Sequence, residues 1–243
     1  MDKRTRVIQD GAWVAANVNG TLRSDADVIH AIDVLKSADL PLHTDPGLAR
    51  DPKNWDQLIA LFSVIASGGR DEPVLDAGAC EGSSAFLPAL AECGYTSLTG
   101  CNIDQHSSMT VCGHGVPIRY QMGDVCDLPF PTHTFRFVAC FSVIEHGVSW
   151  RPFIAEMRRV IKPGGFLFVS TDYWPSKIDT GGQHAFGSPV HVFDRAEIED
   201  MILWANARED FTLDGVPHLD VSAPVVQWLG MKYTFLNLLF RRR

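Results

Sequence analysis

The feature that most constrains this chain is a glycine-containing turn over residues 73–84. A short apolar run ends in a carboxylate at Asp76, and Gly78 and Gly82 then lead through two serines into a second apolar segment. Glycine permits a sharp turn and the close approach of a ligand, and a serine can cap a following helix. The stretch therefore predicts a strand, a tight turn and a helix, with a ligand across the turn at the carboxyl end of the strand.

The spacing of this turn indicates the kind of ligand. A dinucleotide fingerprint is Gly-x-Gly-x-x-Gly, with a pyrophosphate on free helix amides. Here the order is Asp76, Gly78, Cys80, Gly82, and a carboxylate directly before the turn suits a cationic group better than a phosphate. The stretch resembles the first motif of class I S-adenosylmethionine-dependent methyltransferases. That resemblance implies that Asp76 lies at the methionyl end of the cofactor, beside the glycine turn that Gly78, Cys80 and Gly82 form.

Length and composition narrow the class of protein. The chain has 243 residues, 46% of them hydrophobic and 21% charged, which suits one large α/β domain rather than two. Its formal charge of −8 disfavours a broad nucleic-acid face, because phosphate binding needs clustered Lys and Arg.

The cysteines and the apolar segments indicate the compartment. None of the six cysteines forms a CxxC pair, so zinc-ligand spacing is absent and we expect no metal site. No apolar stretch of signal-peptide or membrane-spanning length occurs, so we expect a cytoplasmic protein without membrane attachment.

The segment before the glycine turn predicts two helices, over residues 25–36 and 53–67. Residues 1–70 are therefore interpreted as an N-terminal helical extension, and residues 71–243 as the cofactor-binding domain. The extension either packs on the sheet as a helical layer or caps the substrate site. In the second case Trp13, His43 and Trp55 are candidates to line a pocket.

A second predicted strand, over residues 97–104, ends in polar residues. The family has at this point an acid that binds the ribose hydroxyls. This chain departs from that pattern, because alignment on Gly100 puts Asn102 where the acid belongs. An amide offers one acceptor and one donor, so Asn102 remains a ribose candidate, and Asp104 is the alternative.

The third predicted strand, over residues 117–121, leads into Gly-Asp-Val-Cys-Asp-Leu-Pro-Phe at 123–130. In the resembled family, a segment of this kind follows the third strand, its Asp accepting from the adenine amino group and the next amide donating to the ring. The resemblance assigns these roles to Asp124 and Val125. The alternative is an Asp-rich turn before a proline.

Two more segments continue the family pattern. A buried strand runs from residue 135 toward a Glu-His pair that ends at His146, and the resemblance places Ser142, at the strand exit, beside the cofactor. A helix with an apolar stripe then ends at Lys-Pro-Gly-Gly over 162–165, before a hydrophobic strand. With four matching segments in order, we expect a Rossmann-like, seven-stranded, mostly parallel sheet with helices on both faces and a final antiparallel strand.

The last third of the chain contains the segment that we expect to bind the substrate. Residues 171–193 show little periodicity and are rich in aromatic residues and histidines, which is typical of a binding loop at the cofactor edge. A helix is predicted to start at Asp194, with Glu197 in the reciprocal capping position. Residues 211–213 and 233–240 read as the last two strands.

Methyl transfer from a sulfonium requires alignment of the acceptor and exclusion of water, and a base assists where the acceptor is a hydroxyl. The candidates for catalytic residues are His184, His146 and Asp172, with His184 preferred. We expect a hydroxyl, or else an amine, on a small molecule such as a natural product or sugar. The resemblance is to small-molecule methyltransferases, which are often dimers, so a homodimer is a further expectation.

Two other classes stay open at this point. An NAD(P)-dependent dehydrogenase is disfavoured by the glycine spacing. A methyltransferase-fold protein that has lost catalysis and serves as a binding partner is suggested by Cys80 in place of a glycine and by Asn102 in place of an acid.

Overall fold

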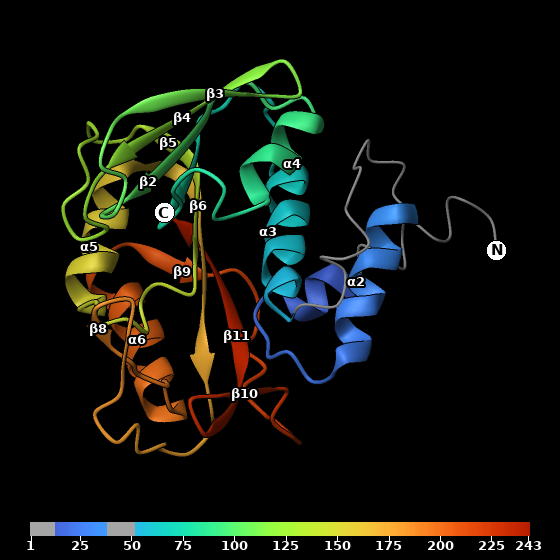
Figure 1. Cartoon of the computed structure of the whole chain (residues 1–243), viewed down its shortest axis with the longest axis vertical. Helices are drawn as coiled ribbons and strands as arrows, with labels where there is room; N and C mark the ends of the chain where they lie inside the picture. Colours follow the sequence, from blue (N-terminus) through green and yellow to red (C-terminus); the bar gives the residue numbers. More distant parts are fainter. Residues whose placement is uncertain (1–12, 38–51) are drawn as a thin grey trace.

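A mostly parallel sheet lies between two helical layers in the computed structural model, which describes residues 13–37 and 52–243 (Figure 1). Within these residues the main sheet has nine strands in the order β10-β11-β6-β5-β1-β2-β4-β3, and β9 also pairs with β11. Their bounds are β1 Val74–Ala77, β2 Leu98–Asn102, β3 Met109–Gly113, β4 Val116–Met122, β5 Phe135–Phe141, β6 Ile161–Tyr173, β9 Phe211–Leu213, β10 Val226–Trp228 and β11 Met231–Arg242.

The centre of the sheet is parallel, with β4, β2, β1, β5 and β6 side by side in the same direction. The strand β1 has β2 on one side and β5 on the other. The chain order therefore reverses at β1, and a crevice opens at the carboxyl ends of the strands on either side of such a switch point. The last strand, β11, is antiparallel to β6, as predicted.

The helices cover the two faces of the sheet with separate apolar clusters. Helices α3 (Lys53–Ser67) and α4 (Phe86–Glu92) pack on one face, where Trp55 and Phe86 are buried. Helices α5 (Trp150–Val160) and α6 (Arg195–Arg208) pack on the other, around Phe153 and Met201. Helix α2 (Asp25–Ser37) lies on the outer side of α3 (Figure 1).

Residues 19–22 join the edge of the sheet between β10 and β9. The amide of Leu22 donates to the carbonyl of Phe235 on β11, and the amide of Asn237 donates to the carbonyl of Gly20, both at 2.9 Å. The segment before β1 is thus more than the helical extension that the sequence predicts. An edge segment of this length carries no periodicity, and its partners lie more than two hundred residues further along the chain.

Several local predictions are confirmed. Helices α2 and α3 lie where the periodicity predicts them, and α6 begins with the expected capping box between Asp194 and Glu197. Among the described residues, β3 and β10 extend the predicted seven-stranded sheet to nine strands. Strands β3 and β4 form a hairpin around His114 and Gly115, whose φ values of 49° and 80° suit a tight two-residue turn.

A second, small hairpin lies inside the long segment after β6. Its strands are β7 (His184–Ala185) and β8 (Ser188–Pro189), joined through Phe186 and Gly187. An isolated bridge between His146 and Val190 ties the base of this hairpin to the segment that follows β5. The predicted irregular loop over residues 171–193 is therefore partly ordered against the exit of β5.

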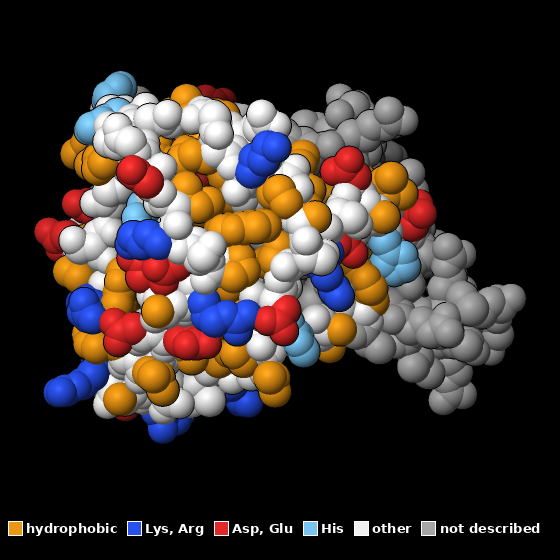
Figure 2. All heavy atoms as spheres, turned by 90° about the horizontal axis from the view of Figure 1, so that it is seen from below, with side chains coloured by type: hydrophobic (Ala, Val, Ile, Leu, Met, Phe, Trp, Pro, Cys, Tyr) orange, Lys and Arg blue, Asp and Glu red, His pale blue; other side chains and the backbone are white. Residues whose placement is uncertain are grey.

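The surface carries both signs of charge. In the view of Figure 2, acidic and basic side chains are interspersed among hydrophobic ones, and this face has no broad basic area. Within the described residues, no helix is long and apolar enough to cross a bilayer.

Candidate active site at the carboxyl ends of the parallel strands

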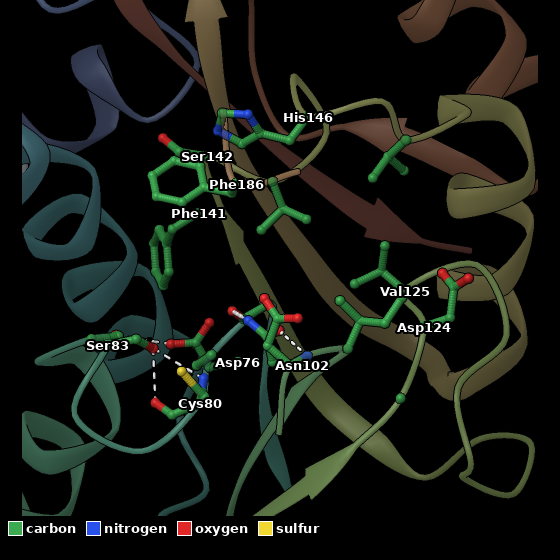
Figure 3. Close-up of a pocket in the computed structure, with 18 of the residues that line it drawn as sticks. Asp76, Cys80, Ser83, Asn102, Asp124, Val125, Phe141, Ser142, His146 and Phe186 are labelled. Carbon is green, nitrogen blue, oxygen red and sulfur yellow. Dashed lines mark hydrogen bonds between the residues drawn. The ribbon is translucent and has the colours of Figure 1, made fainter. Parts of the chain in front are cut away.

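An open cavity of about 1220 Å³ lies at the carboxyl ends of β1, β2, β4 and β5. The first turn of α3 and the tip of the β7–β8 hairpin complete its wall. Figure 3 shows a cluster of polar side chains around Asp76 at one end and aromatic side chains with His146 at the other. The cavity therefore has two chemically different ends.

Asp76 is the buried charge at the polar end. It lies on β1 one residue before the strand ends, it is 2% exposed, and its Oδ2 accepts a hydrogen bond from the Ser84 hydroxyl at 2.9 Å. Loss of solvation raises the pKa of the Asp76 carboxyl from 3.8 to about 7; the Ser84 hydrogen bond lowers it and the charge of Asp56 raises it further. This is a carboxylate that a cation would stabilise.

The turn after Asp76 is closed by its own side chains. Ser83 Oγ donates to the Cys80 carbonyl at 2.7 Å and accepts from the Cys80 amide at 3.0 Å. Gly78 has φ +121°, and a Cβ there would lie 2.3 Å from Cγ2 of Val143. Only glycine fits at this position, so the turn can stay open beside the cavity.

Asn102 at the end of β2 is held by two hydrogen bonds within the protein. Its Nδ2 donates to the Gly78 carbonyl, and its Oδ1 accepts from the Asp104 amide at 2.8 Å. Both residues line the cavity, and Asp104 is exposed. The amide thus joins β2 to the glycine turn, and the Asp104 carboxylate is the charged group at this rim.

The segment after β4 forms another wall. Two hydrogen bonds stabilise a turn at Asp124. Its Oδ1 accepts from the Cys126 amide at 2.8 Å, and its backbone carbonyl accepts from the Asp127 amide at 2.9 Å. Val125 is buried beside it and faces the cavity. A polar side chain and an apolar surface therefore lie together at this wall (Figure 3).

His146 lies at the other end of the cavity, with Phe141, Ser142 and Phe186 (Figure 3). Its ring meets that of Phe186 edge to face, with centroids 5.2 Å apart, and that of Trp228 at 6.4 Å. Phe186 is 82% exposed and has φ +53°, a left-handed conformation that is uncommon for a bulky residue. The hairpin thus presents an aromatic ring at the mouth of the cavity.

Comparison with known proteins shows which proteins this chain resembles. The sequence profile of the methyltransferase domain family matches residues 75–169, which run from β1 into β6. A probable S-adenosylmethionine-dependent methyltransferase of Mycolicibacterium smegmatis is 29% identical over 185 residues, which cover 74% of this chain and 69% of that protein. Residues 75–169 form a methyltransferase domain of the S-adenosylmethionine-dependent kind. Its enzymatic class is methyl transfer, and its cofactor is S-adenosylmethionine.

One further relative agrees with this in sequence, and one solved structure agrees in fold. An uncharacterised methyltransferase of Bacillus subtilis is 31% identical over 139 residues, covering 56% of this chain and 55% of that protein, so the match spans about half of that relative. A solved S-adenosylmethionine-dependent methyltransferase from Methanosarcina mazei has the same fold, with a TM-score of 0.53 and 16% identity over 74% of this chain and 96% of the other.

The structure brings together most of the residues that the sequence singled out. The methyltransferase cavity is lined by Asp76, Gly78, Cys80, Gly82, Asn102, Asp104, Asp124, Val125 and Ser142, and also by His146. These residues come from four separate strand ends. Their convergence follows from the parallel sheet, because the carboxyl ends of its strands meet at one edge.

Two catalytic candidates lie elsewhere. His184 is exposed on β7, with Nδ1 3.0 Å from the Gly182 carbonyl, and does not line the cavity. Asp172 is 3% exposed inside β6 and does not line the cavity. Of the suggested pocket residues, Trp55 is buried in the core, Trp13 packs on His30, and His43 lies outside the described residues.

The sequence did not single out the polar residues of α3, nor Phe186 within the expected binding loop over residues 171–193. Asn54, Asp56 and Gln57 all line the cavity, as does Phe186. The polar stretch within an otherwise apolar helix was the one signal for the α3 residues. Among the described residues, no group of three or more His, Cys, Asp or Glu side chains is placed to hold a metal ion.

Proposed function

We propose that this methyltransferase transfers a methyl group to a hydroxyl, or to an amine, of a small molecule that binds at the His146 end of the cavity. The observation that carries the proposal is the division of one cavity into a polar end with a buried carboxylate and an aromatic end with a histidine. The first end suits the cofactor and the second suits an acceptor that must lose a proton.

The residues at the polar end fit S-adenosylmethionine. Asp76 would bind the cationic methionyl end, because a buried carboxylate with a raised pKa is stabilised by a positive charge. The open turn at Gly78 leaves room beside it, Asp104 or Asn102 would bind the ribose, and Asp124 with Val125 would bind the adenine. When bound, the cofactor supplies an electrophilic methyl group on a positively charged sulfur.

At the aromatic end, His146 is the proposed general base. Its ring lines the cavity, and an imidazole is the side chain best suited to accept a proton near neutral pH. Ser142 lies beside it and is a candidate to orient the acceptor by a hydrogen bond. Phe141 and Phe186 would exclude water from the reacting atoms, which a displacement at a sulfonium requires. His184 remains the alternative base, since its hairpin also carries Phe186.

The acceptor class is a small molecule of natural-product or sugar type. The described residues that line the cavity include no Lys or Arg, which disfavours an acceptor rich in phosphates. The cavity volume of about 1220 Å³ exceeds the range of a usual single-ligand site, roughly 300–1,000 Å³, so two ligands fit in it together. Residues 171–193 then act as the substrate loop, and residues 1–70 as an extension that partly caps the site.

Calorimetric titration with S-adenosylmethionine and with S-adenosylhomocysteine, with NAD as control, tests the cofactor part of the proposal. We expect both sulfur compounds to bind and NAD not to bind. A screen of small-molecule phenols, alcohols and amines with radiolabelled S-adenosylmethionine then tests the acceptor part. Binding of neither sulfur compound to the folded protein would refute the proposed site.

A further inference from the structure

A second buried carboxylate faces the same cavity as Asp76. Asp56, in the first turn of α3, is 1% exposed and lines the cavity. Its Oδ2 accepts a hydrogen bond from the Ser170 hydroxyl on β6 at 2.6 Å, and its Oδ1 accepts from the Gln57 amide at 2.7 Å. The carboxylate is therefore fixed in one orientation by partners on two elements.

Helix α3 is itself anchored to the cofactor turn. Gln57 Oε1 accepts a hydrogen bond from the Ala85 amide at 3.1 Å, directly before the first residue of α4. Asn54 lines the cavity from the same turn of α3. A specific polar contact, in addition to apolar packing, thus holds the start of α3 against the segment that follows the glycine turn.

The two carboxylates act on each other. The negative charge of Asp56 is one of the causes that raise the pKa of Asp76, after burial. The one influence of opposite sign within the described structure is the Ser84 hydrogen bond, and no cationic side chain contributes. Two like charges in a poorly solvated site repel each other, and a cation bound between them removes that cost. The polar end of the cavity would therefore bind a cationic group favourably.

We propose that Asp56 is a second cofactor-binding carboxylate, which together with Asp76 receives the α-ammonium group of S-adenosylmethionine. The inference rests on the proposed function, since it takes the methionyl end to lie at Asp76. Asp56 lies outside residues 75–169, the part of the chain that matches the family profile. The segment before β1 would then contribute a charge to cofactor recognition as well as a wall.

The test compares two ligands that share the adenosine part and differ in the amino-acid part. S-Adenosylhomocysteine carries the ammonium group, whereas 5′-methylthioadenosine lacks it. We expect Asp56→Asn to raise the Kd of S-adenosylhomocysteine by roughly tenfold or more, the range of a lost hydrogen-bonded charge pair, and to leave that of 5′-methylthioadenosine within about twofold. Asp104→Asn is the matched control, because a ribose contact affects both ligands alike.

Each other outcome has a distinct meaning. An equal loss for both ligands in Asp56→Asn would overturn the proposal, since it indicates a purely structural role, and unchanged affinities would overturn it as well. If the wild-type protein binds neither ligand, that result refutes the proposed function itself, independently of the role of Asp56. Should Asp56→Asn not fold, Ser170→Ala releases Oδ2 of Asp56 without removing the charge. We expect that variant to weaken S-adenosylhomocysteine selectively, and equal effects on both ligands would again overturn the proposal.

Discussion

The Ser84 hydroxyl donates to Oδ2 of Asp76 at 2.9 Å, yet the pKa of that carboxyl still rises from 3.8 to about 7. The increase in pKa that burial causes is larger than the decrease that this hydrogen bond causes. Since the folded protein holds this proton more tightly than the unfolded chain does, the Asp76 contribution lowers stability as pH rises from about 4 to about 7. The difference between these two pKa values, at ~1.4 kcal/mol for each pKa unit, is ~4 kcal/mol.

Asp76→Asn is therefore expected to stabilise the cofactor-free protein at pH 8, by up to ~4 kcal/mol, and to change it little near pH 4. Urea unfolding at several pH values measures the effect. The same variant should lose S-adenosylmethionine binding with the fold intact, because it removes the proposed charge partner. For the stability measurement alone, Asp104→Asn on an exposed carboxylate serves as the control. A less stable Asp76→Asn at pH 8 would contradict the raised pKa.

His146→Gln should reduce turnover by about 10²- to 10⁴-fold, the usual contribution of a general base, while the Kd of S-adenosylhomocysteine stays within about twofold. The reason is that His146 lines the proposed acceptor end of the cavity and Asp76 lines the opposite end. Steady-state kinetics with an acceptor found in the screen gives the first value and calorimetry the second. The comparison variant is His184→Ala. A loss of turnover in that variant alone would indicate that His184, on the β7–β8 hairpin, is the general base.

Phe186→Ala should raise the KM of the acceptor by roughly tenfold, because an exposed aromatic ring over an apolar site contributes on the order of 1–3 kcal/mol when a ligand buries it. Cofactor affinity should not change, since the ring lies at the far end of the cavity (Figure 3). Leu203→Ala is a suitable control, as Leu203 is 69% exposed on α6 and does not line the cavity. An unchanged KM would remove Phe186 from acceptor recognition.

What the sequence predicted well is local. The capping box of Asp194 and Glu197 and the Asp76-Gly78 turn each lie within a few residues, and both are present in the structure. The carboxyl ends of the parallel strands bring together residues from several motifs, so the proposed cofactor residues could be expected to lie along one cavity once the order of the strands was inferred.

What the sequence did not predict depends on long-range contacts. Ser170 lies 114 residues after the Asp56 that it orients, so nothing near Asp56 in sequence marks it as part of the site. Phe186 adopts φ +53°, where a turn prediction would place Asn or Gly, so the hairpin left no turn signal at its first loop residue. Ser170 therefore entered the site only with the tertiary structure. Phe186, in contrast, lies in the segment over residues 171–193 that the sequence predicts as a binding loop, and it was only not singled out within that segment.

Asn19 gives the sharpest test of how the segment before β1 belongs to the sheet. Its buried side chain donates from Nδ2 to the Asp214 carbonyl and accepts at Oδ1 from the Leu239 amide, both at 2.6 Å. Asn19→Ala leaves the buried Leu239 amide and the carbonyl of the exposed Asp214 without these bonds. A buried group left unpaired costs ~1–3 kcal/mol and an exposed one less, so we expect a loss of about 1–4 kcal/mol in the free energy of unfolding. Urea denaturation measures this loss. Asn206→Ala, which removes only an exposed hydrogen bond with Arg243, should cost well under about 1 kcal/mol. If both variants unfold at the same urea concentration as the wild type, the edge contact contributes nothing to the stability of the domain, and the extension is attached mainly through α3.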